Sequence, residues 1–348
     1  MRRLFISLLT GLLLVPPTAQ AAERAANQQV SISSRDGSVL AGTLTLPADA
    51  ASRPPGRVPG LVLIQGSGPT DRDGNQPPVL RTDLLRQIAE GLAEKGIATL
   101  RYDKRGMHAN AAGRPASQDD YAEYFSWGRF VDDAYAAYAF LRAQPAVDPG
   151  KTGLFGHSEG GLIALDLATR LVEGERPQAL ILAATYGRPV DAVIREQISR
   201  SLKEANAKPA DRRMFMAEND RAIKALRETG RAPANLPPAL AGLYPSYLGP
   251  FWQAQFRLDP AALAQRYSGP VLLIQGDADI QISAERDALA LDAALQKREP
   301  DDHALIILPR TSHALKPLQN DKDSGFEGEI DPGVISRIST WLLGKLSP

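Results

Sequence analysis

The chain contains no cysteine among its 348 residues. Without thiols it cannot form disulfides, so its hydrophobic core must hold the fold together. Thiol catalysis and cysteine-ligated metal sites are excluded for the same reason. The formal net charge is zero, so there is no basic excess that would point to a nucleic-acid partner.

The apolar stretch at the N-terminus, from Leu4 to Val15, is too short for a comfortable membrane span. It follows two arginines and precedes a small-x-small pattern that ends at Ala21. This arrangement predicts a signal peptide over residues 1–21, cleaved after Ala21, and therefore a periplasmic or secreted protein without stable membrane insertion. A retained N-terminal anchor is the alternative.

Apolar runs typical of buried strands alternate with segments of helical periodicity along the rest of the chain. Strands are expected at 28–33, 39–46, 60–65, 97–102, 151–155, 179–184, 270–275 and 303–308, and helices at 80–95, 127–143, 161–168, 284–296 and 334–346. The turn Arg35-Asp36-Gly37 joins the first two strands as a hairpin. The pattern predicts an α/β fold, with a mostly parallel sheet, a leading antiparallel hairpin and helices on both faces.

Residues 187–267 interrupt this alternation, because they are charged, helical in pattern and broken by prolines. We expect them to form a helical cap inserted into an α/β core whose two parts are 22–186 and 268–348. Apolar and aromatic residues of the cap would suit an acyl or aryl group. The candidates for lining such a pocket are Met214, Phe215, Met216, Leu243, Tyr244, Tyr247, Phe251, Trp252 and Phe256.

A G-x-S-x-G motif, Gly156-His157-Ser158-Glu159-Gly160, stands between an apolar strand and a helical segment. A serine hydroxyl becomes a useful nucleophile when a sharp turn lifts it clear of the backbone, where a base can remove its proton. The flanking glycines permit that turn, since side chains there would collide with the strand and the helix. The motif predicts Ser158 as a nucleophile; a turn whose serine only caps the helix is the alternative.

Histidine is scarce, and only four positions could supply the base for Ser158. In a parallel sheet the reactive groups lie at the carboxyl ends of the strands. His313 directly follows the last strand and is the predicted base. His108 also follows a strand and stays a candidate, whereas His157 lies inside the motif and His303 begins a strand at the opposite end of the sheet.

A carboxylate is needed to orient the imidazole and to stabilise the imidazolium that forms during attack. Gly276-Asp277-Ala278-Asp279 follows the penultimate strand and offers two candidates. We expect Asp279 to be the partner of His313, because it lies further beyond the strand end, while Asp277 could bind amides of the same turn. The chain order Ser158, Asp279, His313 is that of α/β-hydrolases.

Acyl transfer places negative charge on a carbonyl oxygen, which preorganised backbone N–H groups must meet. One donor is expected to be the amide of Glu159, the residue after the nucleophile. The other should come from Gln65-Gly66-Ser67-Gly68-Pro69, with Ser67 the first choice and Gly68 the second. This chemistry needs no metal and no organic cofactor.

The motifs Gln65–Asn75 (QGSGPTDRDGN) and Arg101–Gly106 (RYDKRG), with the Ser158 turn, resemble those of bacterial α/β-hydrolase-fold esterases. The similarity is to the subgroup with a G-S-G-P-x-D-R-D-G-N loop, close to the serine-aminopeptidase-like and dienelactone-hydrolase-like families. The resemblance implies carboxylesterase activity on short acyl esters. This chain departs from those families in carrying Gln65 where histidine is usual, and its serine nucleophile argues against dienelactone hydrolysis.

The expected function is therefore that of a serine hydrolase that cleaves short-chain or aryl acyl esters, small-molecule substrates, through an acyl-enzyme. A peptidase or amidase of the serine-aminopeptidase type is one alternative, in which Glu204, Glu218 or Asp220 would bind a free amine. A non-catalytic binding protein on the same fold is the other. The charged residues of the two motifs are expected mainly to pair with each other, although Arg105 could bind a substrate carboxylate.

Overall fold

The structure is a computed structural model that describes residues 25–48, 50, 57–320 and 322–346. The predicted signal peptide, 1–21, lies outside these residues. None of the helices in the described ranges combines the length and the apolar character that crossing a bilayer requires.

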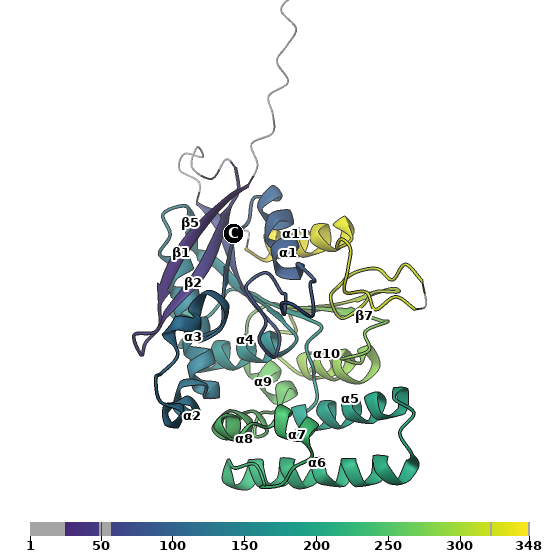
Figure 1. Cartoon of the computed structure of the whole chain (residues 1–348). Coiled ribbons are helices and arrows are strands. Elements are labelled where there is room, and N and C mark those ends of the chain that lie inside the picture. The colour runs from purple at the N-terminus through teal and green to yellow at the C-terminus, as the bar shows by residue number, and fades with distance from the viewer. Residues whose placement is uncertain (1–24, 49, 51–56, 321, 347–348) are drawn as a thin grey trace, which may run out of the picture.

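The centre of the molecule is an eight-stranded sheet in the order β1-β2-β4-β3-β5-β6-β7-β8 (Figure 1). The strands are β1 Ala26–Ser33, β2 Val39–Leu46, β3 Val58–Ile64, β4 Ala98–Tyr102, β5 Val147–His157, β6 Leu180–Ala183, β7 Val271–Gly276 and β8 His303–Leu308. The predicted hairpin is confirmed, because β1 pairs antiparallel with β2. β2 is antiparallel to β4, and the strands from β4 to β8 are parallel to one another.

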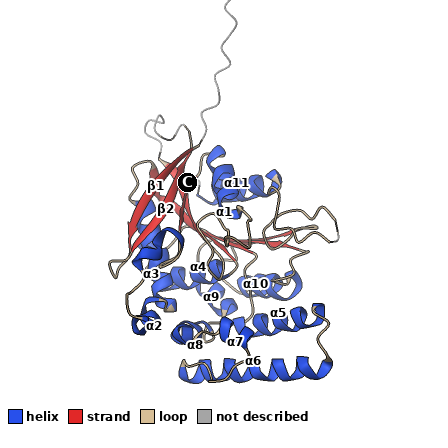
Figure 2. Ribbon diagram, in the orientation of Figure 1, coloured by secondary structure: helices blue, strands red, loops and turns tan. Residues whose placement is uncertain are grey.

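Helices cover both faces of the sheet, as expected for this α/β fold (Figure 2). The α-helices are α1 Leu84–Glu94, α2 Tyr121–Tyr124, α3 Trp127–Arg142, α4 Glu159–Arg170, α5 Val190–Glu204, α6 Pro209–Thr229, α7 Pro238–Leu243, α8 Gly249–Gln255, α9 Pro260–Arg266, α10 Leu289–Leu295 and α11 Pro332–Leu346. Short 3₁₀ turns lie at His108–Gly113, Gln118–Asp120, Glu173–Glu175 and Ser246–Leu248.

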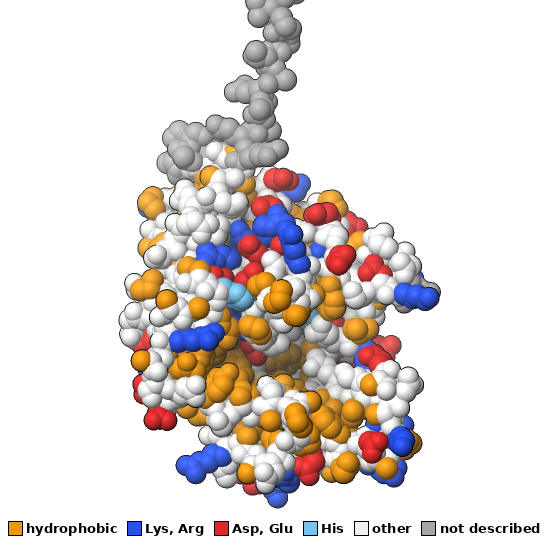
Figure 3. Space-filling view, viewed as in Figure 1, with side chains coloured by type: hydrophobic (Ala, Val, Ile, Leu, Met, Phe, Trp, Pro, Cys, Tyr) orange, Lys and Arg blue, Asp and Glu red, His pale blue; other side chains and the backbone are white. Residues whose placement is uncertain are grey.

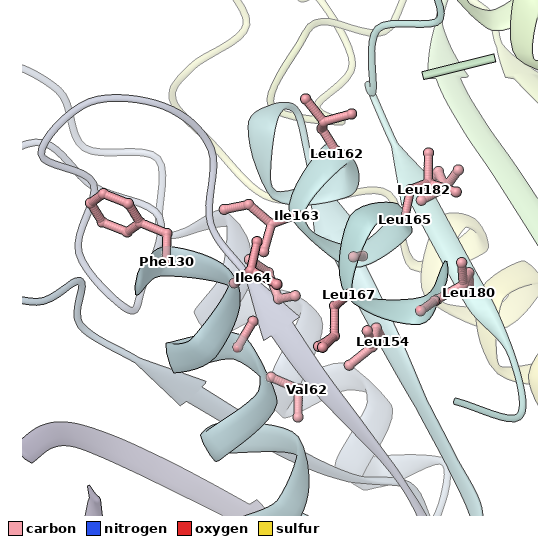
Figure 4. Close-up of a cluster of buried hydrophobic side chains, with 14 of the residues drawn as sticks. Val62, Ile64, Phe130, Leu154, Leu162, Ile163, Leu165, Leu167, Leu180 and Leu182 are labelled. Carbon is pink, nitrogen blue, oxygen red and sulfur yellow. The ribbon is translucent and has the colours of Figure 1, made fainter. Parts of the chain in front are cut away.

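Two hydrophobic cores lie on opposite faces of the sheet because successive strand residues point to opposite sides. On β3, Leu61 and Leu63 join α1 and α11 in one core. Val62 and Ile64 join α3, α4 and α10 in the other. Figure 4 shows this second core beneath α4, the helix that begins directly after Ser158. The turn that carries the serine is thus anchored by packing on a rigid scaffold.

Helices α5 to α9 fill the stretch between β6 and β7 where the sequence predicts a cap. In Figure 1, α5 to α8 lie together on one side of the molecule, below the sheet in this view. Aromatic contacts join α8 of this cap to α3 of the body. The ring centroid of Phe251 lies 5.6 Å from that of Trp127 and 5.7 Å from that of Phe130. Edge-to-face contacts of this kind add about 0.5–1.5 kcal/mol each beyond burial.

Two predicted helices begin differently from expectation. The helix expected from residue 80 begins at Leu84, because Oδ1 of Asn75 accepts the amides of Thr82 and Asp83 and holds the preceding residues as a loop. The helix expected at 284–296 opens with a π-helical turn, Ala284–Ala288, before α10. In that turn Asp287 is fully buried and pairs with Arg188, at the start of the cap.

Candidate active site

Ser158 stands in the turn between β5 and α4, at the carboxyl edge of the sheet. Its backbone has φ 55° and ψ −121°, a conformation that a non-glycine residue adopts only when its surroundings impose it. The amide of Ser158 donates to the carbonyl of Ala183 on β6. This strained strand-to-helix turn presents the side chain at the top of the sheet.

The glycines of the motif are required by contact distances. A Cβ on Gly156 would lie 2.4 Å from the carbonyl oxygen of Gly160. A Cβ on Gly160 would lie 2.2 Å from the carbonyl oxygen of Ile64, at the end of β3. Helix α4 therefore begins in contact with the neighbouring strand, and that contact sets the height of Ser158 above the sheet.

His313 and Asp279 are hydrogen-bonded to each other at the same edge of the sheet. Nδ1 of His313 lies 2.8 Å from Oδ2 of Asp279, and both side chains are almost fully buried. The two residues come from loops that follow β8 and β7, which are adjacent parallel strands. With Nδ1 occupied in this way, Nε2 is the ring nitrogen left to face a reacting group.

Asp279 is held as an anion by its own turn. Oδ1 accepts hydrogen bonds from the backbone amides of Gln281 and Ile282, and Oδ2 also accepts a hydrogen bond from Nε2 of Gln275 at 2.9 Å. Burial alone would raise the pKa of Asp279, but the charge and hydrogen bond of His313, together with these donors, hold the pKa below its usual value. Asp277, the other candidate, is exposed, and no hydrogen bond among the described residues involves its carboxylate.

Ser158 and His313 are connected through His157. Nε2 of His157 lies 2.8 Å from the carbonyl oxygen of His313, and the two imidazole rings are 4.6 Å apart at their centroids. Among the described residues, no hydrogen bond joins the Ser158 hydroxyl directly to His313. Burial and the nearby His313 lower the pKa of His157 to about 3, so its ring is neutral near pH 7.

The two remaining histidines make other contacts. His108 begins a 3₁₀ turn, and its Nε2 lies 2.7 Å from the carbonyl oxygen of Pro69. His303 is the first residue of β8, at the amino end of the strand as expected, and its ring lies between Asp292 and Asp301.

The loop Gln65–Pro69 lies against the turn that carries Ser158. A Cβ on Gly66 would lie 3.2 Å from Cβ of Ser158. The amides of Ser67 and Glu159 donate to no other group in the described part of the chain. Each therefore has an N–H free for an external acceptor. Their role as oxyanion donors stays a prediction.

Lys104 is a buried cation at this site that was not among the predicted residues. Its Nζ lies 2.7 Å from the carbonyl oxygen of Gly66, 3.1 Å from that of Gly68 and 3.3 Å from Oε1 of Glu159. The ammonium group also lies 5.7 Å from the ring centroid of Phe130. The sequence feature that could have identified Lys104 as a site residue is its position two residues after β4, within the RYDKRG motif.

The second carboxylate oxygen of Glu159 connects the site to the cap. Oε2 accepts Nε2 of Gln255, the last residue of α8, at 3.2 Å. The same amide group lies 3.3 Å from the hydroxyl of Tyr186, which follows β6. Burial, reinforced by the charge of Glu159, raises the pKa of Tyr186 well above its ordinary value, so the phenol stays protonated.

The charged residues of the two motifs brace the loops, as expected. Arg72 pairs with Asp103 at 2.7 Å, and Arg101 pairs with Asp73. Asp71 accepts backbone amides of its own turn, those of residues 73 and 75. Arg105 is fully buried and bound by Asp133 and Asp36, so it is not available for a substrate carboxylate.

Apolar side chains line a hollow between the cap and the body, seen in the space-filling view (Figure 3). Four of the candidate lining residues are buried in the aromatic cluster between these parts: Tyr244, Phe251, Trp252 and Phe256. Tyr247 is partly exposed and contacts Tyr121. Met214 is 65% exposed on α6, so it does not belong to a pocket lining.

Comparison with protein families gives a match over residues 82–317 to the model described as serine aminopeptidase, S33. Esterase EstD of Thermotoga maritima is 26% identical over 314 residues, which cover 87% of this chain and 65% of the relative. The chain thus spans less than two thirds of the length of this relative.

Solved structures similar to the chain share its fold. A puromycin-hydrolysing peptidase of Mycobacterium tuberculosis has a TM-score of 0.57 at 16% identity, over 95% of this chain and 41% of its own. Est1E of Butyrivibrio proteoclasticus has a TM-score of 0.53 at 17% identity, over 92% of this chain and 99% of its own. At these identities the likeness concerns the fold alone.

Proposed function

The chain belongs to the serine aminopeptidase S33 family of α/β-hydrolases, and from this membership we propose that it is a serine hydrolase that cleaves carboxylic esters with short acyl or aryl groups. The observation that carries the proposal is the buried hydrogen bond between His313 and Asp279, at the sheet edge that also bears the strained turn of Ser158. The similarity to an esterase of Thermotoga maritima supports the ester as substrate.

In the proposed reaction, His313 removes the proton of the Ser158 hydroxyl as the oxygen attacks the ester carbonyl. Asp279 keeps the imidazole in the tautomer with hydrogen on Nδ1 and stabilises the imidazolium. The lowered pKa of Asp279 supports this role, because its carboxylate stays ionised when the imidazole becomes charged. His313 then protonates the departing alcohol, and water repeats the sequence on the acyl-enzyme.

The tetrahedral oxyanion would be held by the amides of Ser67 and Glu159. Within the residues that the structure describes, neither amide donates to another protein group, and the loop that carries Ser67 packs against Ser158. The N–H of Glu159 is also in the first turn of α4, where a helix leaves its amides unpaired and favours negative charge.

Two of the three cap acids that could bind the free amine of a peptide are paired with arginine, which favours an ester over a peptide substrate. An aminopeptidase needs an anion to bind the free amine of its substrate. Glu218 pairs with Arg221 and Asp220 pairs with Arg195, so both carboxylates are neutralised. Glu204 is exposed at the end of α5. The aromatic residues between cap and body suit an acyl or aryl group.

The proposal is tested by comparing p-nitrophenyl acetate and butyrate with aminoacyl p-nitroanilides on the purified protein. We expect the esters to be turned over faster. Faster turnover of the anilides would replace the esterase with an aminopeptidase. Labelling of Ser158 by a fluorophosphonate probe is expected in either case, and a protein that hydrolyses nothing and takes up no label would be a binding protein on this fold.

We also propose export, from the sequence features of residues 1–21. The test is N-terminal sequencing of the protein from the periplasmic fraction of a Gram-negative host. A first residue of Ala22 is expected, whereas a cytoplasmic product that begins at Met1 would contradict the proposal.

A further inference from the structure

Lys104 uses all three N–H donors of its ammonium group on the backbone and side chain that surround Ser158. The acceptors are the carbonyls of Gly66 and Gly68 and a carboxylate oxygen of Glu159. The Lys104 side chain is 6% exposed and that of Glu159 is 8% exposed. Because burying an ammonium group costs solvation, this complete set of acceptors is what makes its position stable.

The bond to Gly66 determines the direction of the Ser67 amide. The carbonyl of Gly66 and the N–H of Ser67 belong to one trans peptide unit, in which they point in opposite directions. A cation held 2.7 Å from the carbonyl oxygen therefore turns the N–H away from itself. A carbonyl that accepts a hydrogen bond also polarises its peptide, which makes the N–H a stronger donor.

The bond to Glu159 connects the second proposed oxyanion donor to the first. Like that of Ser67, the Glu159 amide donates to no protein group in the described ranges, and the Glu159 side chain is bound by Lys104. One ammonium group thus spans the loop and the helix start that supply the two donors. Its charge also offsets the carboxylate of Glu159, which would otherwise oppose negative charge developing nearby.

We propose that Lys104 is the positioning residue of the oxyanion hole. It sets the orientation of the Ser67 amide and its spacing from the Glu159 amide, and it neutralises the Glu159 carboxylate beside them. The inference rests on the proposed serine-hydrolase function. Lys104 does not touch the reacting atoms; it acts through the two amides.

A merely structural role for Lys104 would resemble that of Arg298. Arg298 is also a buried cation that binds loop carbonyls, those of Tyr267, Gly269 and Asp302. These carbonyls precede β7 and β8, at the amino edge of the sheet, opposite to Ser158. Arg298→Met is therefore a matched control for the loss of a buried cation.

The experiment compares Lys104→Met and Arg298→Met with the wild type in kcat and KM for p-nitrophenyl butyrate, and in melting temperature. Loss of one oxyanion donor costs about 10²–10³ in kcat, and a misdirected donor should cost part of that. We expect Lys104→Met to lower kcat about 10–100-fold with KM changed less than about threefold. Arg298→Met should lower the melting temperature with kcat within about twofold. Equal kcat effects in the two variants would overturn the proposal.

Adding Glu159→Gln to Lys104→Met provides an internal check, because it removes the carboxylate that Lys104 neutralises. We expect the double variant to recover kcat at least about threefold over Lys104→Met, and no recovery would remove the electrostatic part of the proposal. If Lys104→Met does not fold, Lys104→Gln replaces it, because the glutamine keeps an amide donor for one carbonyl. We expect Lys104→Gln to lower kcat over the same range.

The rate of fluorophosphonate labelling distinguishes a failure of the positioning role from a failure of the proposed serine-hydrolase function. A wild type that takes up no label would overturn the serine-hydrolase proposal itself. A wild type that is labelled, together with a Lys104→Met variant that is labelled at the same rate, would overturn only the positioning role.

Discussion

The imidazole of His157 donates a hydrogen bond from Nε2 to the backbone carbonyl of His313, over 2.8 Å. Because a carbonyl can only accept, Nε2 must carry the hydrogen. The residue before the proposed nucleophile therefore holds the loop of the proposed base. This contact links the end of β5 to the loop after β8, although the two histidines are 156 residues apart in the sequence.

Replacing His157 should change how stability depends on pH. Its pKa is about 3 in the folded protein against 6.5 for an ordinary histidine, so the unfolded chain binds the proton more tightly. At pH values between these two pKa values, the unfolding free energy of the wild type therefore decreases as pH falls. His157→Gln keeps an amide donor for the carbonyl of His313 but does not titrate.

The measurement is urea unfolding of the wild type and His157→Gln at several pH values between about 7.5 and about 4. The wild type should lose more stability than the variant over this interval. Parallel curves would contradict a depressed pKa. At pH 7.5, His157→Leu should be less stable than His157→Gln by about 1 kcal/mol, the usual net value of one hydrogen bond.

Ser158→Ala should lower ester turnover by about 10⁴–10⁶-fold, because the members of a catalytic triad act as a unit. Steady-state hydrolysis of p-nitrophenyl butyrate measures the loss. Ser201→Ala, at an exposed position on α5, is the control and should leave turnover unchanged. A loss of less than tenfold at Ser158 would place the nucleophile elsewhere.

Asp279→Asn should lower kcat by about 10³–10⁴-fold, since an amide favours the wrong imidazole tautomer of His313. Asp277→Asn, two residues earlier on an exposed side chain, should change kcat less than about threefold. The two variants are compared in the same ester assay. If Asp277→Asn proved the more damaging, the orienting role would pass to Asp277.

Gly160→Ala should reduce stability by at least about 1–3 kcal/mol, because the added Cβ would lie 2.2 Å from the Ile64 carbonyl oxygen. Gly128→Ala is the matched control, since Gly128 is also helical but has nothing within 4 Å of an added Cβ. Alanine there should leave stability unchanged or raise it by up to about 1 kcal/mol. Denaturant unfolding compares them, and equal effects would show that helix α4 tolerates the shift.

Much of the fold follows from local sequence pattern. Short apolar runs and helical periodicity predict the strands from β1 to β8 within a few residues, because each element buries a face that its own residues specify. They predict five of the eleven α-helices individually, namely α1, α3, α4, α10 and α11, whereas α5 to α9 are predicted only together as one helical segment. The π-helical turn before α10 was not predicted. Asp287, in this turn, pairs with Arg188, which is 99 residues away, and hydrophobic periodicity contains no information about such a long-range contact.

Predictions for the site relied on topology as well as motif. Parallel strands bring their carboxyl ends to one edge, so residues just beyond those ends were candidates for a common site, and His313 and Asp279 are indeed in contact there. Their catalytic roles stay predictions. The role of Lys104 does not follow from the sequence, because its three acceptors lie on the Gly66–Gly68 loop and at Glu159, and only the folded sheet brings these segments together.

The cap enters and leaves the body at β6 and β7, which lie side by side in register, with Ala183 opposite Ile274. An insertion whose two ends are neighbours can be lengthened, shortened or exchanged in evolution without disturbing the strands that carry it. Under the proposed function, selectivity for the substrate would be encoded in this segment and the chemistry of bond cleavage in the body, which are separable portions of the gene. Relatives that keep the same sheet could acquire new preferences by replacing this one segment.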